Sequence, residues 1–332
     1  MNLLRKLLFP FSLLYGGITA LRNFLYNKGL LKSKSYNLPI ICVGNLSTGG
    51  TGKSPMIEFL VSFLRDSKKI AVLSRGYKRK TTGFREVLKT SAVEEVGDEP
   101  LQFKHKFPEI VVAVCEDRQT GIEKLQREAD IILLDDAFQH RKVKASLNIL
   151  LTSFNELYSD DYMLPTGNLR EPKFGAKRAD IIVVTKCPEN ISDSESDHII
   201  RKVKPKKHQQ IYFSKICYSA EIKNATESKP LDYLKDMEFL LITGIANPKP
   251  LVQFLKNKGL NFKEKFFPDH HNFTSSDIKD LKKHSPILTT EKDFMRLQAL
   301  TNDTEIYFLP IRTVILNNEE ASFKKRIEKE TK

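Results

Sequence analysis

A glycine-rich segment near the N-terminus carries residue types that bind phosphate groups. The loop reads STGGTGKS and follows the apolar run Ile40–Val43, which has the character of a buried parallel strand. Apolar residues at helical spacing follow the loop, so strand, glycine loop and helix occur in the order that a phosphate-binding loop requires. The predicted nucleotide contacts are Ser47, Thr48, Gly49, Gly50, Thr51, Gly52, Lys53 and Ser54.

Each part of this loop has a chemical role. The glycine amides can approach phosphate oxygens, Lys53 can reach the β- and γ-phosphates, and Ser54 can place its hydroxyl on Mg²⁺. The helix that begins here adds the positive end of its dipole. The strict motif has glycine where Ser47 stands, and the loop keeps its other three glycines.

A pair of aspartates also indicates a site for nucleotide phosphates and Mg²⁺. The run IILLDD ends in Asp135 and Asp136, directly after a predicted buried strand. Parallel α/β sheets carry their sites at the carboxyl ends of strands, where an aspartate can hold Mg²⁺ directly or through water. The sequence leaves open which of the two approaches the metal.

A third strand bears on the nucleotide base. The segment IIVVTK, residues 181–186, resembles the guanine-reading motif of GTPases, but Pro188 occupies the position of the aspartate that reads guanine. This argues against a GTPase and leaves adenine as the expected base. Lys186 itself could simply be a solvated strand end.

Several polar clusters lie in loops between apolar runs, and each alone is more often turn chemistry than catalysis. They are SRGY (74–77), GDEP (97–100), EDR (116–118), LPTGNLREP (164–172), DHH (269–271) and TTEKD (289–293). Neither HxH nor HExxH spacing occurs in the sequence, which argues against a zinc enzyme.

The alternation of strands and helices predicts an α/β fold: a P-loop NTPase-like parallel sheet flanked by helices. We expect three parts in the 332 residues: an N-terminal membrane-interface helix (1–31), a P-loop domain (32–213) and a smaller C-terminal α/β domain (214–332). The polar stretch 190–210 predicts an exposed helix. The charged tail from Asn317 is expected to fray.

The charge predicts an anionic partner. Lys and Arg number 54 against 41 Asp and Glu, a formal net charge of +13, which suits nucleotide phosphates, nucleic acid or an acidic membrane surface. The four cysteines are isolated, as in a reducing compartment.

The apolar stretch Leu7–Leu21, flanked by basic residues and interrupted by Pro10, has three readings: an interfacial helix, a signal peptide or a core helix. The phosphate loop directly after it argues against a signal peptide, because that loop needs cytosolic nucleotide.

Taken together, these motifs resemble the tetraacyldisaccharide 4′-kinase family of the lipid A pathway in Gram-negative bacteria. The matching segments run in family order: GNLSTGGTGKSP, LSRGYKRK, VGDEP, EDR, LLDDAFQHR, LPTGNLREP, IIVVTKCP, TGIANPKP, FPDHHNF and TTEKD. The resemblance covers roughly residues 1–293, and Ser47 is part of the family's own loop. It implies transfer of the ATP γ-phosphate to the 4′-hydroxyl of a lipid A disaccharide 1-phosphate, giving lipid IVA.

The resemblance also implies roles for single residues. Asp98 looks like the catalytic base, paired with His270 or His271, and Lys53 and Arg118 look like phosphate or transition-state contacts. Ser54, Asp135, Asp136 and Glu171 would form the Mg²⁺ site, with Gln139, His140 and Arg170 in support.

The resemblance further implies a membrane-associated enzyme whose second domain helps to form the active-site cleft. We expect ATP and Mg²⁺ as cofactors, a lipid A disaccharide precursor and an anionic membrane surface as partners, and a monomer that does not bind nucleic acid. The expected location is the cytoplasmic face of the inner membrane, and whether the first helix spans the bilayer or lies on it stays open. The main alternative is a membrane-associated P-loop ATPase switch acting on a protein; a soluble metabolite kinase and a nucleic-acid-dependent NTPase are further rivals.

Overall fold

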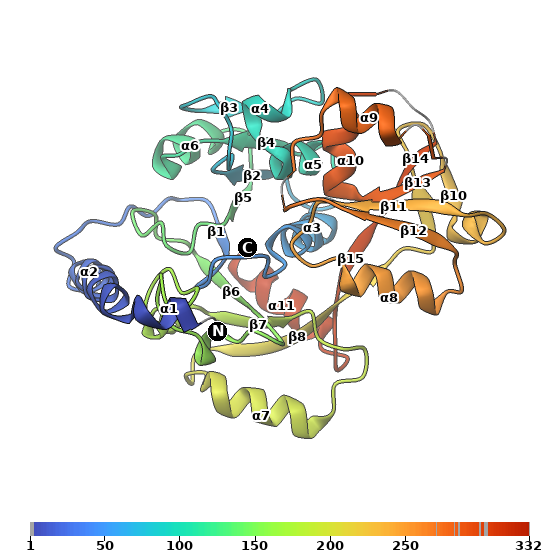
Figure 1. Cartoon of the computed structure of the whole chain (residues 1–332). Helices are drawn as coiled ribbons and strands as arrows, with labels where there is room; N and C mark the ends of the chain where they lie inside the picture. The colour runs from blue at the N-terminus through green and yellow to red at the C-terminus, as the bar shows by residue number, and fades with distance from the viewer. Residues whose placement is uncertain are drawn as a thin grey trace.

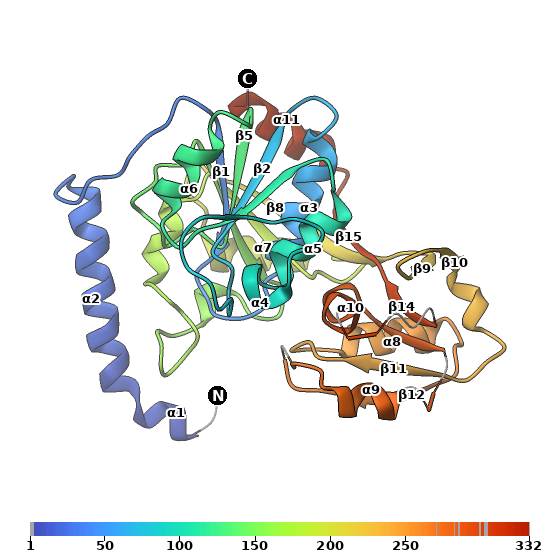
Figure 2. The ribbon, with the colours of Figure 1, turned by 90° about the horizontal axis from the view of Figure 1, so that it is seen from above.

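Two β-sheets organise the chain (Figures 1 and 2). The computed structural model describes residues 3–269, 271–281, 283–284, 286–298, 300–301 and 305–331. The first sheet contains β1 (Ile40–Asn45), β2 (Ile70–Ser74), β3 (Arg85–Glu86), β4 (Val111–Val114), β5 (Ile131–Asp135), β6 (Leu147–Ser153), β7 (Ile181–Thr185), β8 (Gln210–Tyr218) and β15 (Ile311–Ile315). Its strand order is β15-β8-β7-β6-β1-β5-β2-β4-β3, and all neighbours are parallel except the edge strands β3 and β15.

The central strands of this sheet are short runs such as IILLD in β5, in which every residue is buried. Parallel strands of this kind need cover on both faces. One face is covered by α3 (Lys53–Leu64), α5 (Asp98–Lys106) and α11 (Glu320–Glu330), and the other by α6 (Arg118–Leu125) and α7 (Asp193–Val203). The short helix α4 (Val93–Val96) precedes α5. The predicted P-loop NTPase-like architecture and the predicted helix within 190–210 are confirmed.

The second sheet is smaller and has its own apolar core. Its strands, in spatial order, are β10 (Ser228–Pro230), β9 (Glu221–Lys223), β14 (Ile306–Leu309), β13 (Ile287–Thr290), β11 (Phe239–Thr243) and β12 (Phe262–Phe266). The helices α8 (Lys249–Asn257), α9 (Ser275–Leu281) and α10 (Glu291–Gln298) belong to this unit. Short 3-10 turns span Tyr158–Asp160, Lys173–Arg178 and Leu231–Leu234.

The end of the chain returns to the first sheet. β15 pairs antiparallel with β8, joining Ile311 to Tyr218 and Ile315 to Ser214, so the expected boundary at 213/214 falls inside β8. The expectation that the tail frays is wrong. Phe323 of α11 is fully buried, with its ring 5.0 Å from that of Tyr212 in edge-to-face contact. Only two apolar residues of this charged helix, Phe323 and Ile327, are buried, which is why its composition concealed its place in the core.

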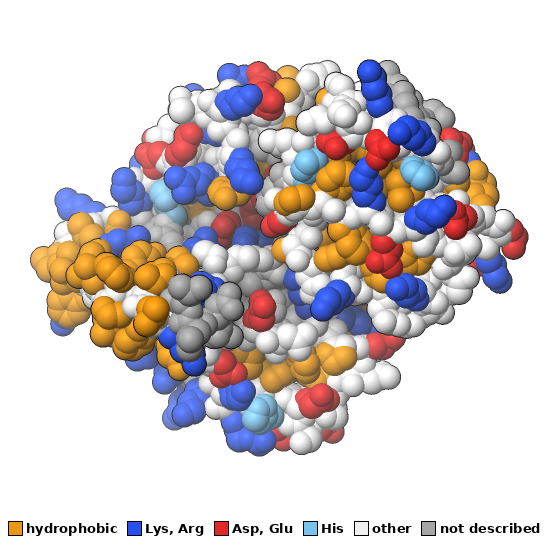
Figure 3. All heavy atoms as spheres, viewed as in Figure 1, with side chains coloured by type: hydrophobic (Ala, Val, Ile, Leu, Met, Phe, Trp, Pro, Cys, Tyr) orange, Lys and Arg blue, Asp and Glu red, His pale blue; other side chains and the backbone are white. Residues whose placement is uncertain are grey.

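The N-terminal segment forms α1 (Leu3–Leu7) and α2 (Phe9–Asn27), beside the first sheet. Pro10 lies in the first turn of α2, where its missing N–H is tolerated, so it does not interrupt the helix. The apolar side chains of α2 face outward and form an apolar patch at one end of the molecule (Figure 3). The core-helix reading of this segment is therefore wrong. Among the described residues, no helix is long and apolar enough to cross a membrane.

A polar seam joins the two units where α10 packs on α5. The Lys106 ammonium lies 2.7 Å from Glu58 Oε2 of α3 and 3.0 Å from Glu291 Oε2 of α10. Gln102 donates to the other oxygen of Glu58 at 2.7 Å. Burial raises the pKa of Glu58 to about 7, against the attraction of Lys106, so this carboxyl titrates near neutral pH.

The Glu58 carboxyl gives the stability of the protein a defined pH dependence. Its pKa in the folded chain lies above the ordinary value of 4.5, so the folded state binds more protons between pH 4.5 and 7. The contribution of Glu58 is therefore fully present below pH 4.5 and is lost as the pH rises through 7. Replacing Glu58 by Gln removes this loss and keeps an acceptor for Gln102. We therefore expect the free energy of unfolding of Glu58→Gln, relative to that of wild type, to rise by on the order of 1–3 kcal/mol as the pH goes from below 4.5 to 8.

Thermal unfolding across this pH range measures the effect. The exposed Glu123, which pairs with Lys34 at the surface, supplies the control Glu123→Gln. Parallel pH profiles for wild type and Glu58→Gln would contradict the assignment.

Candidate functional site

The phosphate loop lies between β1 and α3, as predicted. Gly49 and Gly52 have φ values of 108° and 85°, in the left-handed region that glycine adopts without strain. A Cβ built on Gly49 would meet no other atom within 4 Å, so this side of the loop is open. The helix α3 begins at Lys53, directly after Gly52, so the unpaired amides of its first turn adjoin the loop.

Two consecutive residues at the end of β7 donate hydrogen bonds to carbonyl groups of the phosphate loop. Thr185 at the end of β7 donates its hydroxyl to the carbonyl of Thr51 at 2.8 Å. Lys186, the next residue, donates its ammonium to the carbonyl of Gly50. Lys186 is thus an exposed residue at the strand end that also contacts the phosphate loop.

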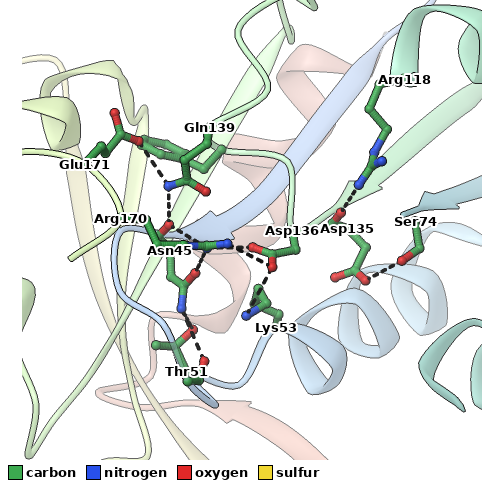
Figure 4. A network of polar contacts seen from close by, with 12 residues as sticks. Asn45, Thr51, Lys53, Ser74, Arg118, Asp135, Asp136, Gln139, Arg170 and Glu171 are labelled. Carbon is green, nitrogen blue, oxygen red and sulfur yellow. Dashed lines mark hydrogen bonds and ion pairs between the residues drawn. The ribbon is translucent and has the colours of Figure 1, made fainter. Parts of the chain in front are cut away.

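Asn45 is a functional residue that sequence reasoning missed. It ends β1, is fully buried, and donates to the Thr51 hydroxyl at 2.8 Å (Figure 4). Its side-chain oxygen accepts from Arg170, and its carbonyl accepts from Gln139 at 2.8 Å. The available signal was an amide residue at the end of a buried strand, directly before the glycine loop.

The two aspartates after β5 have different surroundings (Figure 4). The Asp136 carboxylate accepts two hydrogen bonds from Arg170, at 2.7 and 3.1 Å, and lies 3.8 Å from the Lys53 ammonium. Burial opposes ionisation of Asp136, but Lys53 and Arg170 outweigh it and lower its pKa. Asp136 is therefore a firmly charged group that meets the phosphate loop at Lys53.

Asp135 is almost fully buried. Its Oδ2 accepts from the Ser74 hydroxyl at 3.1 Å, whereas its Oδ1 has no hydrogen-bond partner among the described residues. Burial, together with repulsion from Glu99 and Asp136, raises the pKa of Asp135 to about 7. A buried acceptor without a donor is the arrangement that a cation would satisfy.

Arg118 and His140 are two further predicted site residues. Arg118 is buried, and it donates to the carbonyls of Cys115 at 2.7 Å and Asp135 at 3.3 Å, so its guanidinium fixes the end of β5. Burial, with repulsion from Arg118, lowers the pKa of His140 to about 4, so its ring is neutral.

Glu171 is fully buried, and protein donors already surround its carboxylate. They come from Asn23 at 2.7 Å, Gln139 at 3.1 Å and Arg178 at 2.7 Å. This position indicates a group that organises its neighbours. Among the described residues, no cluster of three or more His, Cys, Asp or Glu side chains is arranged to hold a metal ion.

Asp98 begins α5 at the polar seam and is buried. Lys292 of α10 brings its ammonium to 3.7 Å from Asp98 Oδ2 and 3.4 Å from Glu99 Oε1. Lys292 lies in the TTEKD motif, and the sequence alone assigns it no role. Since Glu99 also acts on the pKa of Asp135, the start of α5 and the end of β5 share one electrostatic environment.

The two predicted histidine partners of Asp98 have different outcomes. His270 lies outside the described residues. His271 pairs with Asp277 at 3.2 Å and stacks on Phe267 at a ring distance of 4.5 Å, so the described contacts turn it toward α9 and not toward Asp98. A buried Arg296–Asp293 ion pair holds this segment, because Arg296 also donates to the His271 carbonyl at 3.1 Å.

Comparison with known proteins places this geometry in a family. A family model described as tetraacyldisaccharide-1-P 4′-kinase matches residues 4–332. The chain is 49% identical over 326 residues to the tetraacyldisaccharide 4′-kinase of Flavobacterium johnsoniae, covering 96% of this chain and 95% of that protein. The chain belongs to the tetraacyldisaccharide 4′-kinase family. The resemblance predicted from the motifs is confirmed, and the alternative of an ATPase switch is not favoured.

Further relatives agree with this membership. The tetraacyldisaccharide 4′-kinase of Bacteroides thetaiotaomicron is 41% identical over 351 residues, covering 98% of this chain and 92% of that one. A crystal structure of LpxK from Aquifex aeolicus in complex with ATP matches with a TM-score of 0.81 and 33% identity, over 99% of this chain and 100% of that one. The fold around the phosphate loop is therefore the fold of this kinase family.

Lys292 supplies a test of the polar seam. Removing the side chain in Lys292→Ala takes away the ammonium that lies 3.7 Å from Asp98 Oδ2 and 3.4 Å from Glu99 Oε1, so the buried Asp98 carboxylate loses a contact that orients it. We expect turnover to fall about tenfold or more because a catalytic group is misplaced, with ATP affinity nearly unchanged. Lys292→Arg should restore part of the loss.

Steady-state kinetics measure this change. Lys263, an exposed lysine paired with Glu238 in the same unit, gives the control Lys263→Ala. Turnover of Lys292→Ala equal to that of wild type would remove Lys292 from the site.

Proposed function

We propose that this chain transfers the γ-phosphate of ATP to the 4′-hydroxyl of tetraacyldisaccharide 1-phosphate and so forms lipid IVA. The observation that carries the proposal is the family match over residues 4–332, in a chain whose phosphate loop, acidic strand end and buried Asp98 are all in place. The names of the relatives supply the substrate class, and the geometry supplies groups suited to the reaction.

The residues fit ATP and Mg²⁺. The open side of Gly49 and the first turn of α3 leave room and amide donors for phosphate oxygens. Lys53 rests against Asp136 and can turn to the β- and γ-phosphates. Ser54 and Asp135 are the groups we assign to Mg²⁺, because Asp135 Oδ1 lacks a donor, with Asp136 beside them. Bound Mg²⁺ neutralises charge on the β- and γ-phosphate oxygens.

Asp98 acts as the general base in the proposed reaction. A sugar hydroxyl is a poor acid, so a carboxylate must take its proton as the new oxygen–phosphorus bond forms. The bond from the γ-phosphorus to the bridging oxygen breaks in the same step, and ADP leaves. Lys292 orients Asp98, and a histidine of the DHH segment remains the proposed partner. We assign Arg118, Glu171, Gln139 and His140 to positioning the acidic pair and the loop.

The proposed acceptor is a lipid, and we propose that the enzyme acts as a peripheral monomer at the cytoplasmic face of the inner membrane. The exposed apolar face of α2 suits the acyl boundary, and nearby exposed cations such as Lys6 and Lys28 suit anionic headgroups. The net charge of +13 is accounted for by ATP and such a surface, without a nucleic acid.

A transfer assay tests this function. Labelled ATP, Mg²⁺ and a purified lipid A disaccharide precursor in detergent should give labelled product with the wild-type chain. Asp98→Asn keeps the shape of the side chain but cannot accept the proton, so we expect turnover to fall on the order of 10²–10⁴-fold with ATP binding little changed.

The control for this variant is Asp197→Asn, at an exposed position on α7. Absence of transfer by folded, ATP-binding wild-type chain would refute the proposed function. Near-normal turnover in Asp98→Asn would refute only the role of Asp98.

A further inference from the structure

The helix α2 is amphipathic with its polar face turned inward. Its buried residues are Ser12, Thr19 and Asn23, which recur at helical spacing along one side. Its large apolar residues are exposed, including Phe11 at 62%, Leu14 at 66% and Ile18 at 60%. The contacts of α2 with the rest of the chain are therefore mainly polar, and they can be traced one by one.

Most of these polar contacts fall on one loop, residues 164–171, and two further hydrogen bonds join α2 to Gln139 and Arg141. The Ser12 hydroxyl donates to the Thr166 hydroxyl at 2.7 Å and accepts from the Thr166 amide at 3.0 Å. The Tyr15 hydroxyl donates to the carbonyl of Arg170 at 2.9 Å. Asn23 donates to Glu171 at 2.7 Å. The helix thus binds this loop along most of its length.

The α1 helix adds to the same attachment. Arg5 donates to the carbonyl of Pro165 at 3.1 Å and to Asn168 Oδ1 at 3.2 Å. Gly16 of α2 lies next to Met163, the residue before the loop, at a distance where a Cβ would make ordinary van der Waals contact at 3.5 Å.

Residues 164–171 also make backbone hydrogen bonds to the phosphate loop and to Leu46 before it. The Thr48 amide donates to the carbonyl of Asn168 at 2.7 Å, and the Arg170 amide donates to the carbonyl of Leu46 at 2.7 Å. The Arg170 guanidinium binds Asp136 and Asn45 (Figure 4). Two successive hydrogen bonds therefore connect Tyr15 of α2 to Leu46 and Asp136 through Arg170.

We propose that the polar face of α2 positions the phosphate loop through residues 164–171, so that bilayer binding on its opposite face tightens the nucleotide site. Ser12, Tyr15 and Asn23 are the positioning residues. The bilayer half of this inference rests on the proposed function; the link from α2 to the loop does not.

The arrangement of the two faces explains why a bilayer would act on the loop. Because the apolar face points away from the chain, a bilayer and the loop can hold α2 at the same time. The docking rests on a few hydrogen bonds, and each contributes only about 0.5–1.5 kcal/mol net, because the same groups bond to water when α2 is undocked. Adsorption to a bilayer orders the helix, so less ordering remains to be supplied when it docks on the loop.

Nucleotide affinity tests the link without any lipid acceptor. The probe is a non-hydrolysable ATP analogue with Mg²⁺, titrated in detergent against Tyr15→Phe/Asn23→Ala. We expect its Kd to rise about fivefold or more, the order of one lost hydrogen bond that reaches the loop. We also expect faster hydrogen exchange of the Thr48 amide. The outcome that overturns the link is an unchanged Kd with unchanged exchange.

The same helix supplies a matched control. Tyr26→Phe/Asn27→Ala makes the same two substitutions at positions whose side-chain polar groups make no hydrogen bond among the described residues. This variant should bind the analogue like wild type. The single variant Tyr15→Phe removes only a hydroxyl and covers the case in which the double variant fails to fold.

Vesicles of phosphatidylethanolamine and phosphatidylglycerol test the bilayer half. With wild type, they should slow exchange of amides in residues 46–52 and 164–171 and lower the Kd of the analogue. Tyr15→Phe/Asn23→Ala keeps the apolar face, so it should still bind vesicles without these changes. Vesicle binding by wild type with no effect on either segment would overturn the coupling. None of these readouts uses phosphate transfer, so their failure is distinguishable from failure of the proposed function.

Discussion

The ion pair between Arg170 and Asp136 is the contact on which the phosphate site depends. It joins the end of β5 to the loop 164–171, and the same guanidinium also reaches Asn45 at the end of β1. A bidentate guanidinium–carboxylate pair fixes direction as well as distance, so the three segments meet in one geometry. Because the side chains of Arg170 and Asp136 are 24% and 35% exposed, water reaches them, and their value lies in orientation more than in net stabilisation.

This pair also separates two adjacent aspartates into different chemical roles. Asp136 has a φ of 47°, which turns the chain at the end of β5 and directs its carboxylate to Arg170 and Lys53. Asp135 points into the protein, where Ser74 supplies its one side-chain donor among the described residues. The Asp136 carboxylate is charged and accepts hydrogen bonds from Arg170. The Asp135 carboxylate is buried with one oxygen lacking a donor in the described part of the chain, and a bound cation would stabilise its charge. This difference is why we propose Asp135 as a ligand of Mg²⁺, since its Oδ1 has no donor among the described residues.

Those parts of this site that are local in the sequence could be predicted from it. Strand, glycine loop and helix occupy consecutive residues, and the acidic pair ends a run whose apolar character already marks a buried strand. Lys292 could not be assigned in this way, because it meets Glu99 across 193 residues of chain and its motif alone reads as a turn. The place of α11 was hidden for a related reason, since Phe323 and Ile327 show their importance only against β8 and α3. For α2, composition located the helix correctly but could not show that Ser12 and Asn23, not its leucines, face the protein.

Two helices, α2 and α10, lie on opposite sides of the first sheet and contribute contacts to the site (Figures 1 and 2). Neither is fixed by a shared apolar core. Among the described residues, each sheet has its own buried clusters, and Lys106, Lys292 and their carboxylates lie at the seam between them. The carboxylates of the seam are buried, so separating Lys106 from Glu58 would leave an unpaired buried charge, which is costly. The fold therefore combines a sheet that holds Lys53 and Asp136 with two polar attachments, and the second of them brings Lys292 of α10 beside Asp98.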